Sequence, residues 1–454
     1  RPRSEWFLLS ALAMKIAANK EHSLSNSEKS KRGKKSSKRA KGRGSGRRTT
    51  KSVKKSILPD HVDLDFWHGM LPNEDTANLL TEEDSFLLRK DLGVNAAGPI
   101  LLSVRNGEKV VNAVIVESES GFRLADREFD TVSELVNYYQ VRKVVIRMDQ
   151  LGVTLGRAVR RKPWELRHKM VAVQKELGSG SFGVVYSATL TYPREKPITV
   201  AAKMLTDVDS EACHALWKEA RVMQEYDHPN IVKFYGVCND SMPYYLVMEY
   251  IRGGSVDTFL RENTQLSIFK RTKIAMEAAA GLDYLHSKGC IHRDIAARNL
   301  LIEKVTKVSD FGLTRKSRYY RVDTEKPMNL RWISPEVFDT ATVDRTTDVY
   351  AFGITLFEIF VVPYDVPYSR WDADEVFSKV VEQGYRISPP YTAPKDIANL
   401  MKECLLEPKL RPTFKMIHVF LLAQAKIMER NPKMNEDMGV DGPSRDEKKK
   451  KKGK

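Results

Sequence analysis

The sequence has few cysteines and no long apolar segment. Its 454 residues include only four cysteines, Cys213, Cys238, Cys290 and Cys404, and these lie far apart. Their spacing fits neither a zinc site nor a disulfide framework, which indicates a reducing, intracellular compartment. The sequence also lacks any uncharged apolar stretch of about 18 residues or more, so no membrane-spanning segment is predicted. These absences argue against a disulfide-stapled secreted scaffold and against an integral membrane protein.

The basic charge of the chain is concentrated at its two ends. The whole sequence has a formal net charge of +16. Residues 1–57 hold 18 Lys and Arg against 3 Asp and Glu, and residues 443–454 hold 7 against 2, which leaves residues 58–442 with a net charge of −4. The tails at 1–57 and 428–454 are predicted to be disordered, because chain with so little apolar content cannot offset its ordering entropy.

The basic N-terminal tail has two readings that the sequence leaves open. It could be attracted to an anionic membrane surface or to nucleic acid, or it could be a solvated linker. The first reading would add peripheral membrane or nuclear association to an otherwise cytoplasmic protein.

Residues 65–152 have the pattern of a small α+β domain. Two helical patterns, at 73–82 and 131–143, enclose strand-forming runs at 85–90, 99–105, 110–117 and 121–125. A basic linker follows at 153–169. From 170 to 427 strands predominate first and helices later, which predicts a second domain with two lobes.

A glycine-rich segment opens this second domain. "LGSGSFGVVY" (Leu177–Tyr186) places Gly178, Gly180 and Gly183 just before a β-branched run that includes Val185. Glycines let backbone N–H groups approach a polyphosphate closely. A dinucleotide-binding turn would need a helix next. Because a strand follows instead, the pattern favours a flap over ATP.

Four charged residues and one amide downstream suit phosphoryl transfer. Lys203 ends an apolar strand in "VAAK", and Glu219 lies in the helical pattern "LWKEARVM", so the two could pair and hold the α- and β-phosphates. In "IHRDIAARN", Asp294 can accept the proton of an attacking hydroxyl, and Asn299 follows at the right spacing to bind a metal ion. Asp310 in "SDFGL" supplies a second metal ligand.

These motifs, with "ISPE" (Ile333–Glu336), "DVYAFG" and "RPT" following in order, resemble those of eukaryotic protein kinases. The loop "HRDIAARN" resembles the tyrosine-kinase form, in which an arginine, here Arg298, lies beside the substrate ring. The resemblance implies ATP with Mg²⁺, or Mn²⁺ as an alternative, and tyrosine-containing protein substrates. It also implies the following ATP-binding residues: Leu177, Gly178, Gly180, Ser181, Phe182, Gly183, Val185, Ala201, Lys203, Met248 as gatekeeper, and Glu249, Tyr250 and Ile251 in the hinge.

Two adjacent tyrosines lie in the expected activation segment. Tyr320 has the spacing from Trp332 that the resemblance implies for the main autophosphorylation site, and Tyr319 is the second candidate. A phosphate there could pair with Arg293, with help from Arg315 or Arg318. The alternative is a pair of exposed loop tyrosines.

The small domain resembles a Src-homology-2 (SH2) domain. "SFLLRK" places Arg89 at the end of a buried strand, where its planar guanidinium suits a phosphate. "FWHG" (Phe66–Gly69) resembles the opening of such a domain. Two residues that usually support phosphotyrosine are replaced by Asn73 and Asn112, and Lys90 stands where an acidic residue is common, so weak phosphotyrosine binding is expected.

An SH2 domain joined by a short linker to a tyrosine kinase most resembles the Fes/Fer group of non-receptor kinases. This group has a membrane-bending region before the SH2 domain, where this sequence has the basic tail, so membrane recruitment by that route is not expected. We therefore expect ATP-dependent phosphorylation of tyrosine, autophosphorylation in the activation segment, and SH2-dependent targeting to phosphotyrosine proteins. A catalytically silent scaffold should lack at least one phosphotransfer residue, and none is missing. Nucleic-acid binding through the tails is a separate alternative that does not exclude the kinase.

Overall fold

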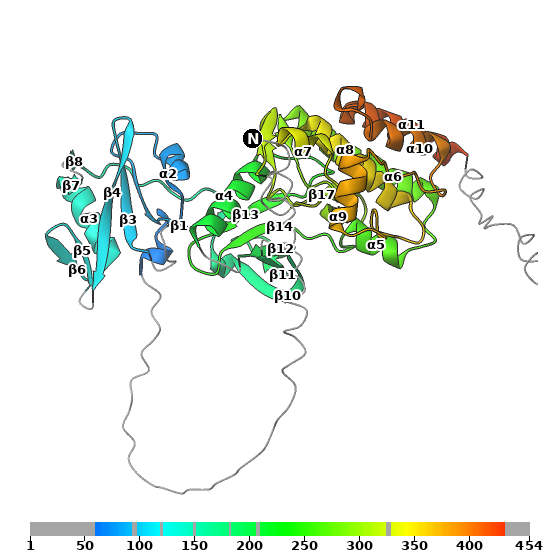
Figure 1. The fold of residues 1–454 in the computed structure, drawn as a ribbon. Coiled ribbons are helices and arrows are strands. Elements are labelled where there is room, and N and C mark those ends of the chain that lie inside the picture. Colours follow the sequence, from blue (N-terminus) through cyan, green and yellow to red (C-terminus); the bar gives the residue numbers. More distant parts are fainter. Residues whose placement is uncertain are drawn as a thin grey trace, which may run out of the picture.

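The computed structural model describes residues 60–92, 98–118, 121–148, 151–180, 183–205, 209–323 and 328–431. Two domains follow one another, and the first lies beside the strand-rich lobe of the second (Figure 1). The predicted N-terminal tail and the C-terminal tail from 432 onward lie outside the described residues. The last helix ends at Arg430, so it continues past the expected domain end at 427. None of the helices in the described ranges is long and apolar enough to cross a membrane.

The first domain is a central sheet with a helix on either side, as predicted. Its elements are η1 (Asp60–Asp63), β1 (Trp67–Met70), α2 (Asn73–Leu79), β2 (Phe86–Lys90), β3 (Ile100–Asn106), β4 (Lys109–Ser118), β5 (Gly121–Leu124), β6 (Arg127–Phe129), α3 (Val132–Arg142), β7 (Ile146–Met148) and β8 (Leu151–Val153). The six strands β1 to β6 lie in sequence order. β1 pairs with β2 in parallel, and the later pairs are antiparallel. Figure 1 shows α2 on the side that faces the second domain and α3 on the far side.

The small lobe of the second domain is a curved sheet with one long helix. It comprises β9 (Glu165–Leu166), η2 (His168–Met170), β10 (Val171–Gly180), β11 (Gly183–Leu190), β12 (Ile198–Met204), α4 (Ser210–Gln224), β13 (Phe234–Cys238) and β14 (Tyr245–Glu249). The strand order is β10-β11-β12-β14-β13-β9. The antiparallel register places Val185 opposite Lys203 and Ala201 opposite Met248. The glycine-rich segment, the lysine and the expected hinge are thereby carried by successive neighbouring strands of the sheet.

The large lobe is mainly helical, as predicted. It contains α5 (Val256–Glu262), α6 (Ile268–Ser287), β15 (Cys290–Ile291), η3 (Ala297–Asn299), β16 (Leu300–Ile302), β17 (Thr306–Val308), β18 (Arg315–Lys316), β19 (Tyr319–Arg321), α7 (Glu336–Thr340), β20 (Thr342–Asp344), α8 (Arg345–Phe360), α9 (Ala373–Val376), the π-helical turn η4 (Phe377–Glu382), α10 (Lys395–Cys404), η5 (Pro408–Leu410) and α11 (Phe414–Arg430). α6 and α8 carry many fully buried residues, so they form the centre of this lobe.

The basic linker forms part of the fold. Residues Glu165 and Leu166 pair in parallel with Val237 and Cys238, which adds β9 as a sixth strand to the small-lobe sheet. Arg161 donates hydrogen bonds to the backbone oxygens of Trp67, Glu165 and Leu166 and to the side chain of Asn239. Burial lowers the pKa of Arg161, and nearby carboxylates partly counteract that effect. The linker therefore joins the domains rigidly.

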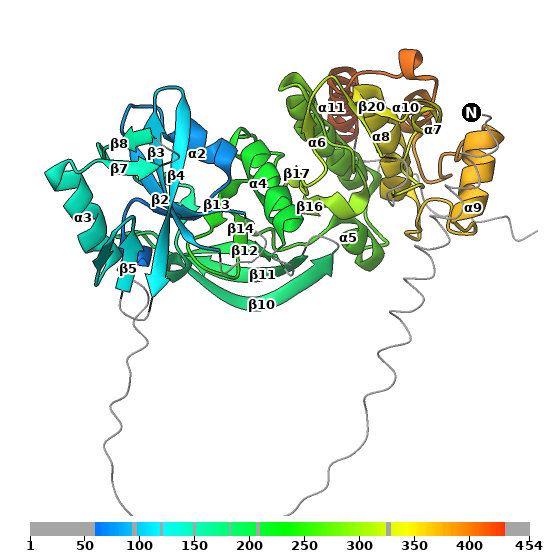
Figure 2. The same ribbon diagram turned by 60° about the vertical axis from the view of Figure 1, so that its left-hand side comes forward.

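The two domains contact each other backbone to backbone at β1. The Met70 N–H donates to the Asn239 carbonyl at 2.8 Å, and the Asn239 amide donates to the carbonyls of His68 and Met70 at 2.6 and 2.9 Å. Gly69 has φ +60°, and a Cβ there would lie 1.9 Å from the Asn239 carbonyl oxygen. Only glycine allows this approach. In Figures 1 and 2 the first domain lies against the small lobe, with α2 next to α4.

We predict that Gly69→Ala separates the two domains. Gly107→Ala is the matched control, because Gly107 has φ +57° but nothing within 4 Å of its Cβ position. Both variants carry a left-handed strain of roughly 1–2 kcal/mol, but only Gly69→Ala adds the clash. Small-angle scattering should show a larger radius of gyration for Gly69→Ala alone, and limited proteolysis should cut between the domains. Equal behaviour of the two variants would contradict the close-packed joint.

Candidate active site

The expected lysine–glutamate pair is formed. Lys203, on β12, donates from Nζ to Oε1 and Oε2 of Glu219 at 3.0 and 2.8 Å. Glu219, on α4, is buried, and Lys203 Nζ also lies 3.9 Å from Oδ1 of Asp310. Burial alone would lower the pKa of Lys203, but the two carboxylates outweigh it and raise that pKa. The lysine is therefore held as a fixed cation at the cleft.

The outer face of α4 is held by the first domain. Arg221 donates from Nε and Nη2 to the carboxylate of Asp75, with a shortest distance of 2.6 Å, and Nη1 lies 2.7 Å from Glu74. Burial lowers the pKa of Arg221, but its bonds to Asp75 and Glu74 outweigh this and raise it. Since Arg221 is two residues after Glu219, the same helical turn contacts both the cleft and the first domain.

The candidate catalytic base is held by three donors. Oδ1 of Asp294 accepts from Arg298 Nη2 at 2.5 Å and from Asn329 Nδ2 at 2.9 Å. Oδ2 accepts from Asn299 Nδ2 at 2.8 Å. These three donors fix the orientation of the Asp294 carboxylate.

A buried aspartate on α8 fixes the loop beneath this base. Asp348 accepts from the backbone N–H groups of His292 and Arg293 at 2.7 and 2.9 Å, and from His286 Nε2 at 2.9 Å. Arg293 has φ +76°, a conformation that costs about 1–2 kcal/mol for a non-glycine residue. Asp348 offsets part of this cost by binding the N–H groups of the strained turn.

Of the two expected metal ligands, Asn299 contacts the candidate base and Asp310 lies near Lys203. Asn299 uses its amide N–H groups on Asp294, so its amide oxygen is the atom left to face a cation. Asp310 has φ +59°, and its side chain is about one third exposed at 34%. The side chain of Phe311, by contrast, is buried against the rings of Tyr226 and His292.

Strands that carry the glycine-rich segment and the expected hinge flank β12, the strand of Lys203. A Cβ on Gly183, at φ +135°, would lie 2.2 Å from the carbonyl of Met204, so the turn requires glycine. Met248 and Glu249 end β14, and the Glu249 N–H donates to the Lys233 carbonyl, just before β13, at 2.8 Å. Leu177, Gly178 and Gly180 lie on β10, Tyr250 and Ile251 follow β14, and Ser181 and Phe182 fall outside the described residues.

Arg298, the arginine expected beside the substrate ring, stacks on Trp332 next to the candidate base. The Arg298 guanidinium stacks 4.4 Å from the centre of the Trp332 ring. Trp332 Nε1 donates to Glu358 at 2.9 Å, and Glu358 also accepts from the Ala297 N–H at 3.0 Å. The base, its arginine and the tryptophan are thereby fixed to α8 as one unit.

Tyr320 and Tyr319 have different surroundings. The Tyr320 ring lies 4.4 Å from the Arg293 guanidinium and 5.1 Å from that of Arg315, whereas the Tyr319 side chain is 70% exposed. A hydrogen bond from Arg315, followed by the charges of Arg315, Arg293 and Lys218, lowers the pKa of Tyr320. The Nε atoms of Arg293 and Arg315 are buried, and neither has a partner among the described residues.

The first domain buries Arg89 completely. Its Nε donates to Ser103 Oγ at 2.9 Å, and its Nη2 donates to Oδ1 of Asn73 and of Asn112 at 2.5 and 3.2 Å. The two asparagines that replace the usual supporting residues therefore contact the arginine directly. Burial lowers the pKa of Arg89, and Asp91 counteracts the shift.

Sequence reasoning missed several residues of these sites. Asn329 and Asp91 lie in segments without a recognisable motif. The ion pair between Arg221 and Asp75 was missed because it forms between two domains. Asp348 was visible only as the start of "DVYAFG". Its role depends on a loop 55 residues earlier in the chain.

Comparison with known families agrees with this arrangement. The protein tyrosine and serine/threonine kinase family matches residues 171–421, and the SH2 domain family matches residues 66–139. The chain belongs to the protein kinase family, in the group that joins an SH2 domain to a tyrosine kinase domain.

Its relatives within that group are the Fer and Fps kinases. The chain is 34% identical to human tyrosine-protein kinase Fer over 362 residues, which cover 78% of this chain and 43% of Fer. It is 34% identical to the transforming protein Fps of avian sarcoma virus (strain PRCII), over 80% of this chain and 68% of that protein. It is 30% identical to Fer-related kinase 1 of Caenorhabditis elegans, over 80% of this chain and 94% of that kinase. The chain thus spans less than half the length of human Fer.

Proposed function

We propose that this chain is a non-receptor protein tyrosine kinase that transfers the γ-phosphate of ATP to tyrosine hydroxyls of protein substrates. The formed pair between Lys203 and Glu219, with Asp294 held ready by its three donors, is the observation that carries this proposal. Asp294 accepts the phenolic proton as the tyrosine oxygen bonds to the γ-phosphorus and ADP leaves. Arg298, stacked on Trp332, supports a tyrosine acceptor because its plane can lie beside a phenol ring.

The residues present suit ATP with a hard divalent cation. The amide oxygen of Asn299 and the carboxylate of Asp310 are oxygen ligands, which Mg²⁺ prefers, and Mn²⁺ accepts the same donors. No group of three or more His, Cys, Asp or Glu residues suited to a metal occurs in the described part of the chain. The cation would therefore take its remaining ligands from phosphate and water. When bound, it neutralises charge on the phosphates, while Lys203 orients them.

Asp294→Asn should lower turnover at least about 10³-fold while changing ATP affinity less than about threefold, because the amide cannot take the phenolic proton. Turnover would be measured on a tyrosine polymer and affinity with a fluorescent nucleotide. Asp396→Asn, at an exposed position in the first turn of α10, is the control and should have no effect. Equal losses of affinity and turnover would contradict the role of a base.

We further propose that Tyr320 is the main autophosphorylation site. Its ring lies between Arg293 and Arg315, so a phosphate there would meet two guanidinium groups with buried, unpartnered Nε atoms. Charge-assisted bonds of this kind order activation segments. Tyr319 is exposed, and the arginine contacts found in the described residues are on the ring of Tyr320.

Tyr320→Phe should therefore remove the activation gained by preincubation with ATP, lowering final turnover roughly tenfold, the effect of about 1.4 kcal/mol. Tyr319→Phe, the adjacent control, should keep most of that activation. Phosphatase treatment should bring wild type to the level of Tyr320→Phe. A larger loss for Tyr319→Phe would reverse the assignment.

The contact between Arg221 and Asp75 supports an activating role for the SH2 domain. It holds α4 from outside in the position where Glu219 reaches Lys203. Removing it lets α4 move outward and break the buried pair. The contact is partly exposed, with Arg221 at 31%, so its effect on activity should be moderate.

Arg221→Glu should lower kcat/KM about two- to tenfold on a soluble peptide. The charge-swapped double variant, Arg221→Glu with Asp75→Arg, should recover part of that loss, because it restores opposite charges across the interface. The double variant also serves as the control for helix damage. An additive loss in the double variant, or a gain in activity for Arg221→Glu, would rule out the activating contact.

Two further roles extend the proposal. Arg89 supports binding of phosphotyrosine proteins, with an affinity below that of an open arginine pocket. The basic segment 1–57, which lies outside the described residues, would attract an anionic membrane surface or nucleic acid through its 18 Lys and Arg, adding peripheral membrane or nuclear association to a cytoplasmic kinase.

A further inference from the structure

Every N–H group of the Arg89 guanidinium already has an acceptor within the chain. Ser103, Asn73 and Asn112 accept three of the five, as described above. The two N–H groups of Nη1 donate to the Leu71 carbonyl at 2.8 Å and to Oδ1 of Asp91 at 3.2 Å. An arginine offers five N–H donors in total, so none is left for a ligand.

Asp91 supplies the negative charge in this pocket. Among the described residues it is the one carboxylate paired with Arg89. Its Oδ1 also accepts from the Leu92 N–H at 2.9 Å, which holds the side chain toward the arginine. A buried guanidinium needs an anionic partner, and here the chain provides it. A phosphate with a charge of about −1.5 to −2 would meet a carboxylate beside its binding site.

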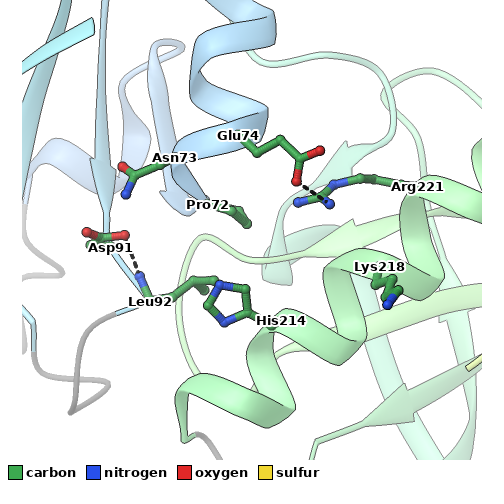
Figure 3. Close-up of a pocket in the computed structure, with 8 residues that line it drawn as sticks. All are labelled: Pro72, Asn73, Glu74, Asp91, Leu92, His214, Lys218 and Arg221. Carbon is green, nitrogen blue, oxygen red and sulfur yellow. Dashed lines mark hydrogen bonds and ion pairs between the residues drawn. The ribbon is translucent and has the colours of Figure 1, made fainter. Parts of the chain in front are cut away.

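The position of Asp91 allows the carboxylate to move. Its side chain is 42% exposed, whereas that of Arg89 is buried. It borders a cavity of about 750 Å³ between the two domains, large enough for a phosphotyrosine side chain. Figure 3 shows the residues that line it: Pro72, Asn73, Glu74, Asp91 and Leu92 from the SH2 domain, and His214, Lys218 and Arg221 from α4.

We propose that Asp91 is an internal competitor of phosphotyrosine, whose carboxylate occupies Arg89 and must turn into the cavity before a phosphate can bind. This inference rests on the proposed binding of phosphotyrosine at Arg89 and names the residue that sets its strength. The pocket is complete without a ligand, so the SH2 domain can dock on α4 when no phosphotyrosine is present. Only abundant or multiply phosphorylated partners would displace Asp91.

The test measures binding of O-phospho-L-tyrosine to the full chain by calorimetry. All proteins carry Asp294→Asn, so that no autophosphorylated tyrosine competes for the pocket. Asp91→Ser removes the carboxylate, and Asp91→Asn removes its charge while keeping the cap on Leu92. Glu108→Gln is the matched control, because it removes one exposed carboxylate of the same domain at the β3–β4 turn. Thermal melting confirms that each variant is folded.

Both Asp91 variants should bind phosphotyrosine at least about tenfold more tightly than the parent, the equivalent of roughly 1.4 kcal/mol, while Glu108→Gln stays at the parent value. Adding Arg89→Leu to Asp91→Ser should remove the gain. If the parent binds and neither Asp91 variant improves on it, the competition is wrong and phosphotyrosine binding stands. If none of the proteins binds, the proposed phosphotyrosine site itself is wrong, and the competition with it. An equal gain in Glu108→Gln would reduce the effect to general charge and overturn the inference.

Discussion

The buried pair between Lys203 and Glu219 is the contact on which the cleft depends. Removing two charges from water costs several kcal/mol per ion, so such a pair does not hold a helix in place by its own strength. It needs α4 to be positioned by other contacts. The inner face of α4 packs Leu216, Trp217 and Ala220 into the shared core, and Arg221 holds its outer face against the SH2 domain. The catalytic geometry is therefore a property of both domains.

Backbone contacts between the two domains help to hold α4 in place. Side-chain ion pairs at a surface are weak and flexible. Here the contact is made first by backbone, with Gly69 against Asn239, and β9 continues the small-lobe sheet into the linker. Arg161 bonds to residues on both sides of the joint. The ion pair between Arg221 and Asp75 then forms between two domains that the backbone contacts already hold together.

The sequence predicted those site residues that belong to short motifs with a fixed spacing. Lys203, Glu219, Asp294, Asn299 and Asp310 each sit in a motif with fixed spacing. In the structure Lys203 pairs with Glu219 and lies 3.9 Å from Asp310, and Asn299 bonds to Asp294. The interdomain residues were not predictable in this way. Asp75, Arg221 and Asn239 have no local pattern, because their roles arise only from how two folded domains meet. The segment 153–169 was identified as a basic linker, and its strand β9 was not predicted, because two residues leave too short a pattern to recognise.

The start of α2 contacts both the proposed phosphotyrosine pocket and α4. Asn73 bonds to Arg89 in that pocket, while the next two residues, Glu74 and Asp75, bond to Arg221 on α4. Asn73, Glu74 and Asp75 follow one another in the first turn of α2, so a backbone movement at Asn73 would act on its two neighbours. A ligand that displaces Asp91 would compete with Asn73 for the same guanidinium. The resulting adjustment would pass through one turn of backbone to the contact that holds α4, and so to Glu219. Coupling between phosphotyrosine and catalysis then requires no change of fold, only a small shift of a turn that contacts both sites.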